Sequence, residues 1–177
     1  NQTDYAYDAL GRLVWTKAPD GGETFYEYNL GGQLTKVIDP TGAITTATYD
    51  FLGRKLTSSE VVRQPILQTF TTTYEYWPSG LLKKVTPPGR NGTVYHYNAV
   101  GELTLVIDPA GNQTQYQYDF AGRQTRVILP DGSGTRVTYD GAGRPVTTET
   151  LDTDGTTVLA TSAFAYDPAG NVVGATD

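Results

Sequence analysis

The residue types most able to do chemistry here include a lone histidine. His96 is the only histidine in the 177-residue chain. A neutral imidazole can act as a general base or bind a metal ion. No serine with a suitable partner lies close to it in sequence, and the chain has no cysteine. His96 also takes the repeat position that Glu75 and Gln117 take elsewhere, so we interpret it as an outward surface residue.

A second candidate is the segment Asp152-Thr153-Asp154-Gly155, which begins like a calcium-binding loop. A complete loop needs further oxygen ligands and a glutamate farther along the chain. The next four residues are Thr-Thr-Val-Leu, so this ligand set is incomplete. We therefore interpret the segment as an Asp/Gly hairpin turn. We expect no metal ion and no other cofactor in this chain.

Four arginines stand at one place in a recurring phrase, each after a glycine. They are Arg12, Arg54, Arg123 and Arg144. Guanidinium groups could bind an anionic sugar or a phosphate. The other interpretation is an ion pair with Asp or Glu of a neighbouring repeat, which contributes about 0.2–1 kcal/mol when exposed. The formal net charge is −6, and scattered arginines in an acidic chain favour ion pairs.

The phrase that contains these arginines reads Tyr-Asp-x-x-Gly-Arg and recurs along the whole chain. Full copies begin at Tyr7, Tyr49, Tyr118 and Tyr139, and looser copies begin at Tyr28, Tyr76, Tyr97 and Tyr166. Successive copies start 21 residues apart, except after Tyr49 and Tyr139, where the step is 27. A fixed period of this size indicates a repeat array. We predict one array over residues 1–177, a fragment of a longer chain. Its repeats start near Thr3, Thr24, Thr45, Thr72, Thr93, Thr114, Thr135 and Ser162.

The residues before each repeat tyrosine predict a strand. Threonine or serine stands four places earlier and mostly an aromatic residue stands two places earlier, with mostly polar or small residues between them. This alternation with a period of two is typical of a strand with two different faces. Aromatic rings spaced along a sheet could stack on sugar rings, and they could equally keep a single layer dry enough to fold. The possible ligand-contact aromatics are Tyr5, Tyr26, Tyr74, Tyr95 and Tyr116.

A glycine four residues after each repeat tyrosine predicts a tight turn, because glycine accepts a positive φ angle. These structural turn glycines are Gly11, Gly32, Gly53, Gly80, Gly101, Gly122, Gly143 and Gly170. A second strand and a Pro/Asp/Gly turn follow, so each repeat reads strand, turn, strand, turn. The predicted fold is all-β, with tandem antiparallel β-hairpins forming a curved single-layer sheet. The two longer repeats carry six extra residues each, around Glu60 to Thr69 and Leu151 to Ala160, and we expect these to lengthen a hairpin.

Composition narrows the class of protein further. The hydrophobic fraction is 38%, and 13 tyrosines dominate the aromatic residues. Tyrosine covers apolar area while its hydroxyl tolerates water. This composition favours a thin layer with two partly wet faces. No stripe of Lys or Arg and no apolar run of 18 residues is present, so we expect neither nucleic acid as a partner nor a membrane span.

The repeated phrase, followed by a strand, a Pro/Asp/Gly turn and Thr-x-aromatic-x-Tyr, resembles the YD repeat of the Rhs and teneurin-like proteins. The resemblance covers essentially the whole chain. It implies a strip of antiparallel strands that spirals into a hollow β-shell. Bacterial members of this group are secreted or surface polymorphic toxins and components of insecticidal toxin complexes, in which the shell encloses a toxic C-terminal domain. In teneurins the related barrel is part of an extracellular adhesion protein.

Members of this family often carry a self-cleaving site built around Asp-Pro-x-Gly-Leu. The first four residues of that pattern occur at 39–42, 108–111 and 167–170. The residues that follow are Ala43, Asn112 and Asn171 instead of leucine. Each copy also falls in a turn of the repeat. We therefore carry no protease role over to these aspartates.

The sequence thus predicts a non-catalytic structural segment of an Rhs-type secreted or cell-surface protein, forming part of a β-shell that encapsulates a toxin or effector cargo. The expected partners are the remainder of its own longer chain and the enclosed domain. The alternative is a carbohydrate or cell-surface binding module that uses the tyrosines named above to contact glycans. A third class, an enzyme, is disfavoured because no catalytic set clusters in the sequence.

Overall fold

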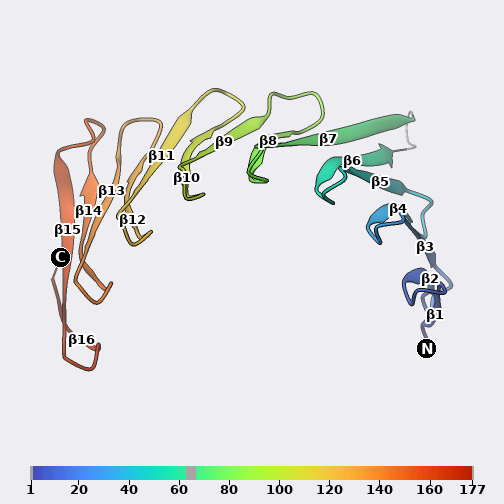
Figure 1. Ribbon diagram of the computed structural model, residues 1–177, viewed down its shortest axis with the longest axis horizontal. Helices are drawn as coiled ribbons and strands as arrows, with labels where there is room; N and C mark the ends of the chain where they lie inside the picture. The colour runs from blue at the N-terminus through green and yellow to red at the C-terminus, as the bar shows by residue number, and fades with distance from the viewer. Residues whose placement is uncertain (1, 63–66, 177) are drawn as a thin grey trace. The chain divides into compact units, whose positions relative to one another are not determined.

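A computed structural model describes residues 2–62 and 67–176 of the chain. The chain divides into two compact halves, Asn1–Gly92 and Thr93–Asp177. Within each half, every strand pairs in antiparallel fashion with the next strand along the chain, and short turns join them (Figure 1). The described residues form no helix, and therefore none that could cross a membrane. The prediction of tandem antiparallel β-hairpins is confirmed.

The described residues form eight strands in the N-terminal half and eight in the C-terminal half. The first eight are β1 (Asp4–Tyr7), β2 (Leu13–Lys17), β3 (Glu23–Tyr28), β4 (Leu34–Ile38), β5 (Ile44–Tyr49), β6 (Lys55–Val62), β7 (Gln68–Tyr76) and β8 (Leu82–Thr86). The second eight are β9 (Thr93–Tyr97), β10 (Leu103–Ile107), β11 (Gln113–Tyr118), β12 (Gln124–Ile128), β13 (Gly134–Tyr139), β14 (Pro145–Leu151), β15 (Val158–Tyr166) and β16 (Val172–Thr176).

The turn inside the Tyr-Asp phrase has one geometry, which the first repeat illustrates. The Gly11 N–H donates to the Asp8 carbonyl oxygen at 3.0 Å, and the Asp8 N–H donates to the Arg12 carbonyl oxygen at 2.9 Å. Gly11 has φ of 77°, a left-handed conformation that costs glycine little. These bonds describe a three-residue hairpin loop closed by a bulge at glycine. The strand register accordingly shifts between Ala6 and Tyr7.

The turn at the opposite rim uses the same bonds with proline added. The Gly42 N–H donates to the Asp39 carbonyl oxygen at 2.9 Å, and the Asp39 N–H donates to the Ala43 carbonyl oxygen at 3.0 Å. Pro40 occupies the first central position of this turn, where its fixed φ suits the geometry. At both rims, short segments of the sequence form the turns that join one strand to the next. Within each half, each strand therefore pairs with its neighbour in the sequence.

In each half, one face of the sheet carries the tyrosines, and we call it the tyrosine face. Tyr26 lies directly opposite Val37, which in turn lies opposite Thr45. Tyr116 lies opposite Val127, which lies opposite Thr135. Directly opposed residues share a face of the sheet. The alternation of side chains therefore places the aromatic and threonine columns of the repeat together on this face.

We call the other face the reverse face. The first strand of each repeat predicted mostly polar or small residues on this face, but the face is less polar than that. A row of apolar side chains crosses it from strand to strand, because the second strands of the repeats contribute apolar residues. This row runs Trp15, Phe25, Ile38, Ile44 and Val61. A charged row lies beside it, and there the Lys36 ammonium binds a Glu27 carboxylate oxygen at 2.8 Å.

The described residues of neither half form a deep core. Leu151 is the only buried apolar residue among those described, with 1% of its surface exposed. Most other strand side chains are half-buried. The prediction of a thin layer with two partly wet faces is confirmed.

The two longer repeats contain the longest strands. In the second of them, β14 has 7 residues and β15 has 9, and the loop 152–157 joins them. In the first, β6 has 8 residues and β7 has 9. The extra residues therefore lengthen a hairpin, as predicted, although residues 63–66 of the first hairpin lie outside the described residues.

Candidate functional site

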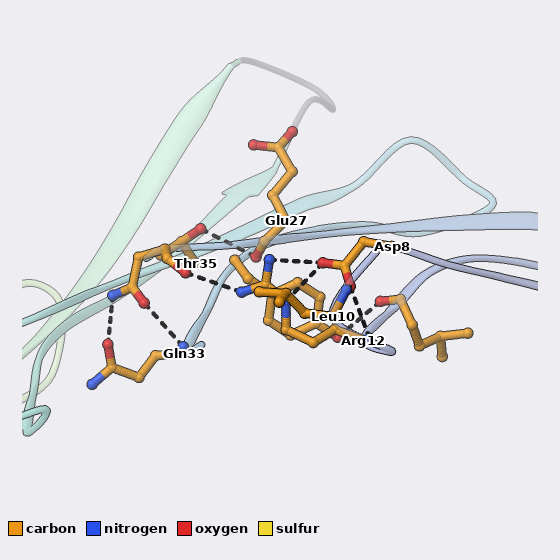
Figure 2. A network of polar contacts seen from close by, with 9 residues as sticks. Asp8, Leu10, Arg12, Glu27, Gln33 and Thr35 are labelled. Carbon is orange, nitrogen blue, oxygen red and sulfur yellow. Dashed lines mark hydrogen bonds and ion pairs between the residues drawn. The ribbon is translucent and has the colours of Figure 1, made fainter. Parts of the chain in front are cut away.

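The aspartate of the Tyr-Asp phrase organises its own turn. In the first repeat, the Asp8 Oδ1 accepts the N–H groups of Leu10 at 2.9 Å and Arg12 at 3.0 Å. The Asp8 Oδ2 accepts the Arg12 Nε–H at 2.7 Å, and it lies 2.7 Å from Nη2 of the same side chain (Figure 2). The backbone and side-chain hydrogen bonds from Arg12 hold the pKa of the Asp8 carboxyl below its ordinary value.

The same arginine also reaches the next repeat. The Arg12 guanidinium carbon lies 4.9 Å from the centroid of the Tyr28 ring. Its Nη1 donates to the Asn29 carbonyl oxygen at 3.1 Å. The Tyr28 hydroxyl donates back to the Leu13 carbonyl oxygen at 2.8 Å. We call this set of contacts between consecutive repeats the Arg–Tyr link.

The cation–π contact of the link recurs at three further arginines, of which Arg123 and Arg144 also donate from Nη1 to a carbonyl oxygen of the next repeat. Their guanidinium-to-ring distances are 4.8 Å for Arg54 and Tyr76, 4.7 Å for Arg123 and Tyr139, and 4.5 Å for Arg144 and Tyr166. The prediction that these arginines pair with an acid of a neighbouring repeat is wrong. Each one binds the aspartate four residues earlier in its own turn, and the neighbouring repeat supplies the tyrosine ring. These contacts occupy the guanidinium groups, so the arginines are poorly placed to bind a separate anion.

Repeats without the arginine keep the turn but lose the cation–π contact, although the Tyr49 hydroxyl still donates to the Leu34 carbonyl oxygen at 2.8 Å. The Asn29 Nδ2 donates to the Gln33 Oε1 at 2.5 Å, and the Gln33 N–H donates to the Asn29 Oδ1 at 3.0 Å; these are the two dashed lines that end at Gln33 in Figure 2. In the same way, the Asn98 Nδ2 donates to the Glu102 Oε2 at 2.6 Å. A neutral or acidic side chain at this position cannot make a cation–π contact with a ring.

The eight turn glycines named from the sequence all have positive φ angles. The values are 77° for Gly11, 81° for Gly32, 82° for Gly53, 89° for Gly80, 89° for Gly101, 78° for Gly122, 85° for Gly143 and 92° for Gly170. They lie at the tips of hairpins on separate repeats, and each serves the backbone of its own turn.

The five candidate ligand-contact tyrosines lie on the tyrosine face, each on a different strand. Tyr5 is 56% exposed, and Tyr26, Tyr74, Tyr95 and Tyr116 are half-buried. A valine of the following strand lies opposite each half-buried ring, as Val85 lies opposite Tyr74 and Val106 opposite Tyr95. Within each half, the sheet therefore spaces these rings one repeat or more apart and does not gather them into one cluster.

The structure places the remaining candidates in ordinary structural roles. His96 is half-buried on β9, opposite Leu105. The Asp154 Oδ1 accepts the N–H groups of Thr156 and Thr157 at 2.7 Å each. Hydrogen bonds from the Thr157 hydroxyl and from these N–H groups lower the pKa of Asp154 to about 2. Across the described ranges, no group of three or more His, Cys, Asp or Glu side chains could hold a metal ion.

The aspartates of the three Asp-Pro-x-Gly segments likewise cap their own turns. The Asp39 Oδ1 accepts the N–H groups of Thr41 at 2.8 Å and Ala43 at 2.9 Å. Asp108 and Asp167 make the corresponding bond to the N–H of the asparagine four residues later, at 2.9 and 2.8 Å. Each carboxylate is thus engaged within its own hairpin.

Two surface features escaped the sequence reasoning because each depends on how strands align. In the C-terminal half, a hollow of about 450 Å³ is lined mainly by apolar side chains, among them Val127, Leu129, Leu151 and Leu159. In the N-terminal half, a hollow of about 560 Å³ is lined by Thr71, Thr73, Thr86 and the loop from Pro87 to Asn91. For the hollow in the N-terminal half, the one indication in the sequence is that Thr71 and Thr73 stand two residues apart, so they share a face of their strand.

Known structures share this architecture. A crystal structure of TcdB2-TccC3-TEV aligns with 97% of the chain and 11% of its own chain, with a TM-score of 0.60 and 18% identity. The structure of the Photorhabdus luminescens Tc holotoxin pore with a mutation in TccC3 aligns with 98% of the chain and 12% of its own, with a TM-score of 0.52 and 17% identity. Likeness at this level of identity shows the fold. The chain spans only about one ninth of the length of these structures.

A comparison with curated proteins finds no match. The sequence profile described as Teneurin YD-shell matches residues 1–163, which is most of the chain. This match agrees with the Tyr-Asp phrase, the turn geometry and the antiparallel hairpins described above. The chain therefore belongs to the Teneurin YD-shell family.

Proposed function

We propose that this chain is a non-catalytic wall segment of a β-shell that encloses a toxin or effector cargo in an Rhs-type secreted or cell-surface protein. The observation that carries the proposal is the Arg–Tyr link. It couples each arginine-containing repeat to the repeat that follows, at guanidinium-to-ring distances of 4.5 to 4.9 Å. A layer held by contacts between successive repeats is what a wall requires.

The burial of side chains supports the same function. A globular enzyme surrounds its active site with a packed core, whereas only Leu151 is buried among the described apolar residues. The aspartates of the hairpin turns are each bound within their own turn, as Asp8 and Asp119 show. Side chains with these partners hold the wall together and are not arranged around a substrate.

The comparisons support a shell within a larger assembly. The similar structures are named for toxin-complex components, and one is described as a Tc holotoxin pore. Each aligns with this chain over only 11% or 12% of its own length. A wall must return on itself before it separates an inside from an outside, so enclosure would require a longer parent chain. The cargo would be a separate domain of that parent.

Limited proteolysis of a parent protein tests this proposal. One version keeps the array intact, and a second lacks two whole repeats, residues 93–134. A third carries Arg123→Ala and Arg144→Ala, which remove two Arg–Tyr links without shortening the wall. We expect the cargo to resist protease in the intact parent and to be cut much faster in the deletion. Equal cleavage of the cargo in all three versions would contradict the shell.

A carbohydrate-binding function is the second candidate, and one observation favours it. Within the described residues, the hydroxyls of Tyr26, Tyr74 and Tyr116 have no hydrogen-bond partner, unlike the hydroxyl of Tyr28. Tyr5 is also 56% exposed. Rings with free hydroxyls could stack on sugars and donate to them. Titration of the chain with neutral oligosaccharides, comparing Tyr116→Ala with the unaltered chain, tests this function.

A further inference from the structure

Seven hydroxyl side chains form a lattice on the reverse face of the N-terminal half. Two rows cross strands β5 to β8, because the register aligns serine and threonine residues from strand to strand. One row is Thr48, Thr57, Thr73 and Thr86, and the other is Thr46, Ser59 and Thr71. Neighbouring strands lie about 4.8 Å apart and alternate residues along a strand about 6.7 Å apart, so the hydroxyls are spaced on the scale of a sugar ring.

Some hydroxyls of the lattice are hydrogen-bonded to one another, and others have no partner among the described residues. Thr48 and Thr57 share a hydrogen bond of 2.7 Å between their hydroxyls, and Ser59 and Thr71 share one of 2.8 Å. Thr73 is exposed, and in the described part of the chain neither its hydroxyl nor that of Thr86 has a partner. The open hydroxyls thus gather at the β7–β8 end of the lattice.

The open end of the lattice faces a hollow. Thr71, Thr73 and Thr86 line one part of this space of about 560 Å³, and the loop from Pro87 to Asn91 lines the rest. No aromatic side chain is among the lining residues. The hollow is therefore bordered by hydroxyls, by backbone and by the side chains of Arg90 and Asn91.

Arg90 is distinct from the other arginines that the structure describes. The four arginines of the repeated phrase bind aspartates, Arg136 binds Glu149, and Arg126 binds the Gly155 carbonyl oxygen. Across residues 2–62 and 67–176, Arg90 alone among arginines has no partner for its guanidinium. Its side chain is exposed at the rim of the hollow. A guanidinium with its five donors unused is suited to a carboxylate or a sulfate.

A second cation strengthens the positive charge beside the lattice. A Cβ atom placed on Gly92 would lie 2.7 Å from the Lys84 Cε and 2.5 Å from the Thr86 Oγ1, so the Lys84 side chain runs next to Thr86. The closest acid on the same strand as Thr73 is Glu75, which binds Lys83 at 3.4 Å. Arg90 and Lys84 therefore place two positive charges beside the hollow, while Glu60 lines a neighbouring hollow that shares Pro88 with it.

We propose that the hydroxyl lattice, Arg90 and Asn91 form a binding site for an acidic oligosaccharide. The hydroxyls of Thr73 and Thr86 would exchange hydrogen bonds with sugar hydroxyls, and Arg90 would bind the carboxylate or sulfate that the sugar carries. Single-stranded nucleic acid is disfavoured, because such sites stack bases on aromatic rings and this hollow has none. The site lies on the reverse face and uses none of the five tyrosines of the tyrosine face.

Isothermal titration of the full chain with three probes tests the site. The probes are a galacturonic acid tetramer, which supplies carboxylates, a heparin-derived tetrasaccharide, which supplies sulfates, and maltotetraose, which is neutral. We expect an acidic probe to bind and maltotetraose to bind at least about tenfold more weakly, because a charge-assisted hydrogen bond is lost. The stronger of the two acidic probes identifies the anion.

Matched variants separate a built site from general attraction to positive charge. Arg90→Gln is expected to weaken binding of the acidic probe about tenfold, and Thr73→Val, which keeps the β-branched shape, several-fold. Arg136→Gln removes one positive charge from the C-terminal half and is expected to leave binding unchanged. Circular dichroism confirms that each variant is folded. Absence of binding by both acidic probes, or equal weakening by Arg90→Gln and Arg136→Gln, would overturn the proposal and leave the proposed shell function untouched.

Discussion

The guanidinium of Arg144 lies 4.5 Å from the centre of the Tyr166 ring, which belongs to the next repeat. Its Nε also donates to the Asp140 carboxylate at 2.7 Å, inside its own turn. One side chain thus ties the turn to itself and the repeat to its neighbour. Because the Tyr-Asp phrase supplies all three residues, the motif that identifies the family also explains how its repeats hold together.

Removal of one Arg–Tyr link should destabilise the C-terminal half measurably. We expect Arg123→Ala to lower the free energy of unfolding by about 1–2 kcal/mol, because a cation–π contact and a hydrogen bond to the Asp140 carbonyl oxygen are lost together with the ion pair to Asp119. Urea denaturation followed by circular dichroism measures the change. The control is Arg136→Ala, which removes an exposed ion pair with Glu149 and should cost less than about 1 kcal/mol. Equal losses would show that the link adds nothing beyond an ordinary ion pair.

The local features of the fold could be predicted from the sequence because they depend on short segments. The alternation before Tyr118 predicted a strand, and Gly122 at a turn tip has the positive φ that the phrase required. Features that depend on register between strands could not be predicted in this way. The partner of Arg12 on the next repeat lies 16 or 17 residues away, and only the folded hairpins bring Tyr28 and Asn29 to it.

The same limit explains what was missed on the reverse face. The first strand of each repeat predicted polar or small residues there, but the apolar row from Trp15 through Ile38 depends on which residues of the second strand lie opposite. The hydroxyl lattice likewise depends on the pairing of Thr57 with Thr73 across a long hairpin. Composition alone gave no signal that these threonines would align.

A side chain at a turn glycine should be costly where the backbone is left-handed. We expect Gly122→Val to lose about 1–3 kcal/mol of stability, because φ is 78° and a β-branched residue is strained there. The new Cβ would also lie 2.9 Å from a Glu102 carboxylate oxygen. Phe120→Val is the control two residues away, since Phe120 is fully exposed and makes no such demand. The melting temperatures of the two variants should therefore differ clearly, and a similar fall in both would rule out the turn as the cause.

The loop of the β14–β15 hairpin should become less stable in acid. The pKa of Asp154 is lowered from 3.8 to about 2, chiefly by the hydrogen bond from the Thr157 hydroxyl. A carboxyl whose pKa is lower in the folded state stabilises the fold above its unfolded value, and this stabilisation is lost as the pH falls through the folded value. The contribution of Asp154 should therefore be complete above pH 3.8 and should vanish towards pH 2.

The change that tests this dependence is Asp154→Asn, which cannot ionise. We expect the variant to be less stable than the original chain at pH 7 and to differ from it less and less as the pH falls towards 2. Urea midpoints measured at half-unit steps between pH 2 and pH 7 give the comparison. Asp152→Asn in the same loop leaves the contacts of Asp154 in place and should keep the original slope. A constant difference between Asp154→Asn and the original chain at every pH would contradict the assignment.

The tyrosine of the Tyr-Asp phrase and the tyrosine two residues before it should contribute differently to stability through their hydroxyls. Tyr139 donates to the Gln124 carbonyl oxygen at 2.8 Å, linking its repeat to the preceding one. Tyr116, on the same face, has no hydrogen-bond partner for its hydroxyl among the described residues. We expect Tyr139→Phe to lose about 0.5–1.5 kcal/mol and Tyr116→Phe to be close to neutral, because only the first removes a bond within the fold. Urea denaturation of both variants provides the measurement. A loss in Tyr116→Phe as large as in Tyr139→Phe would mean that both columns are structural, and it would remove the main support for sugar contact by the tyrosine face.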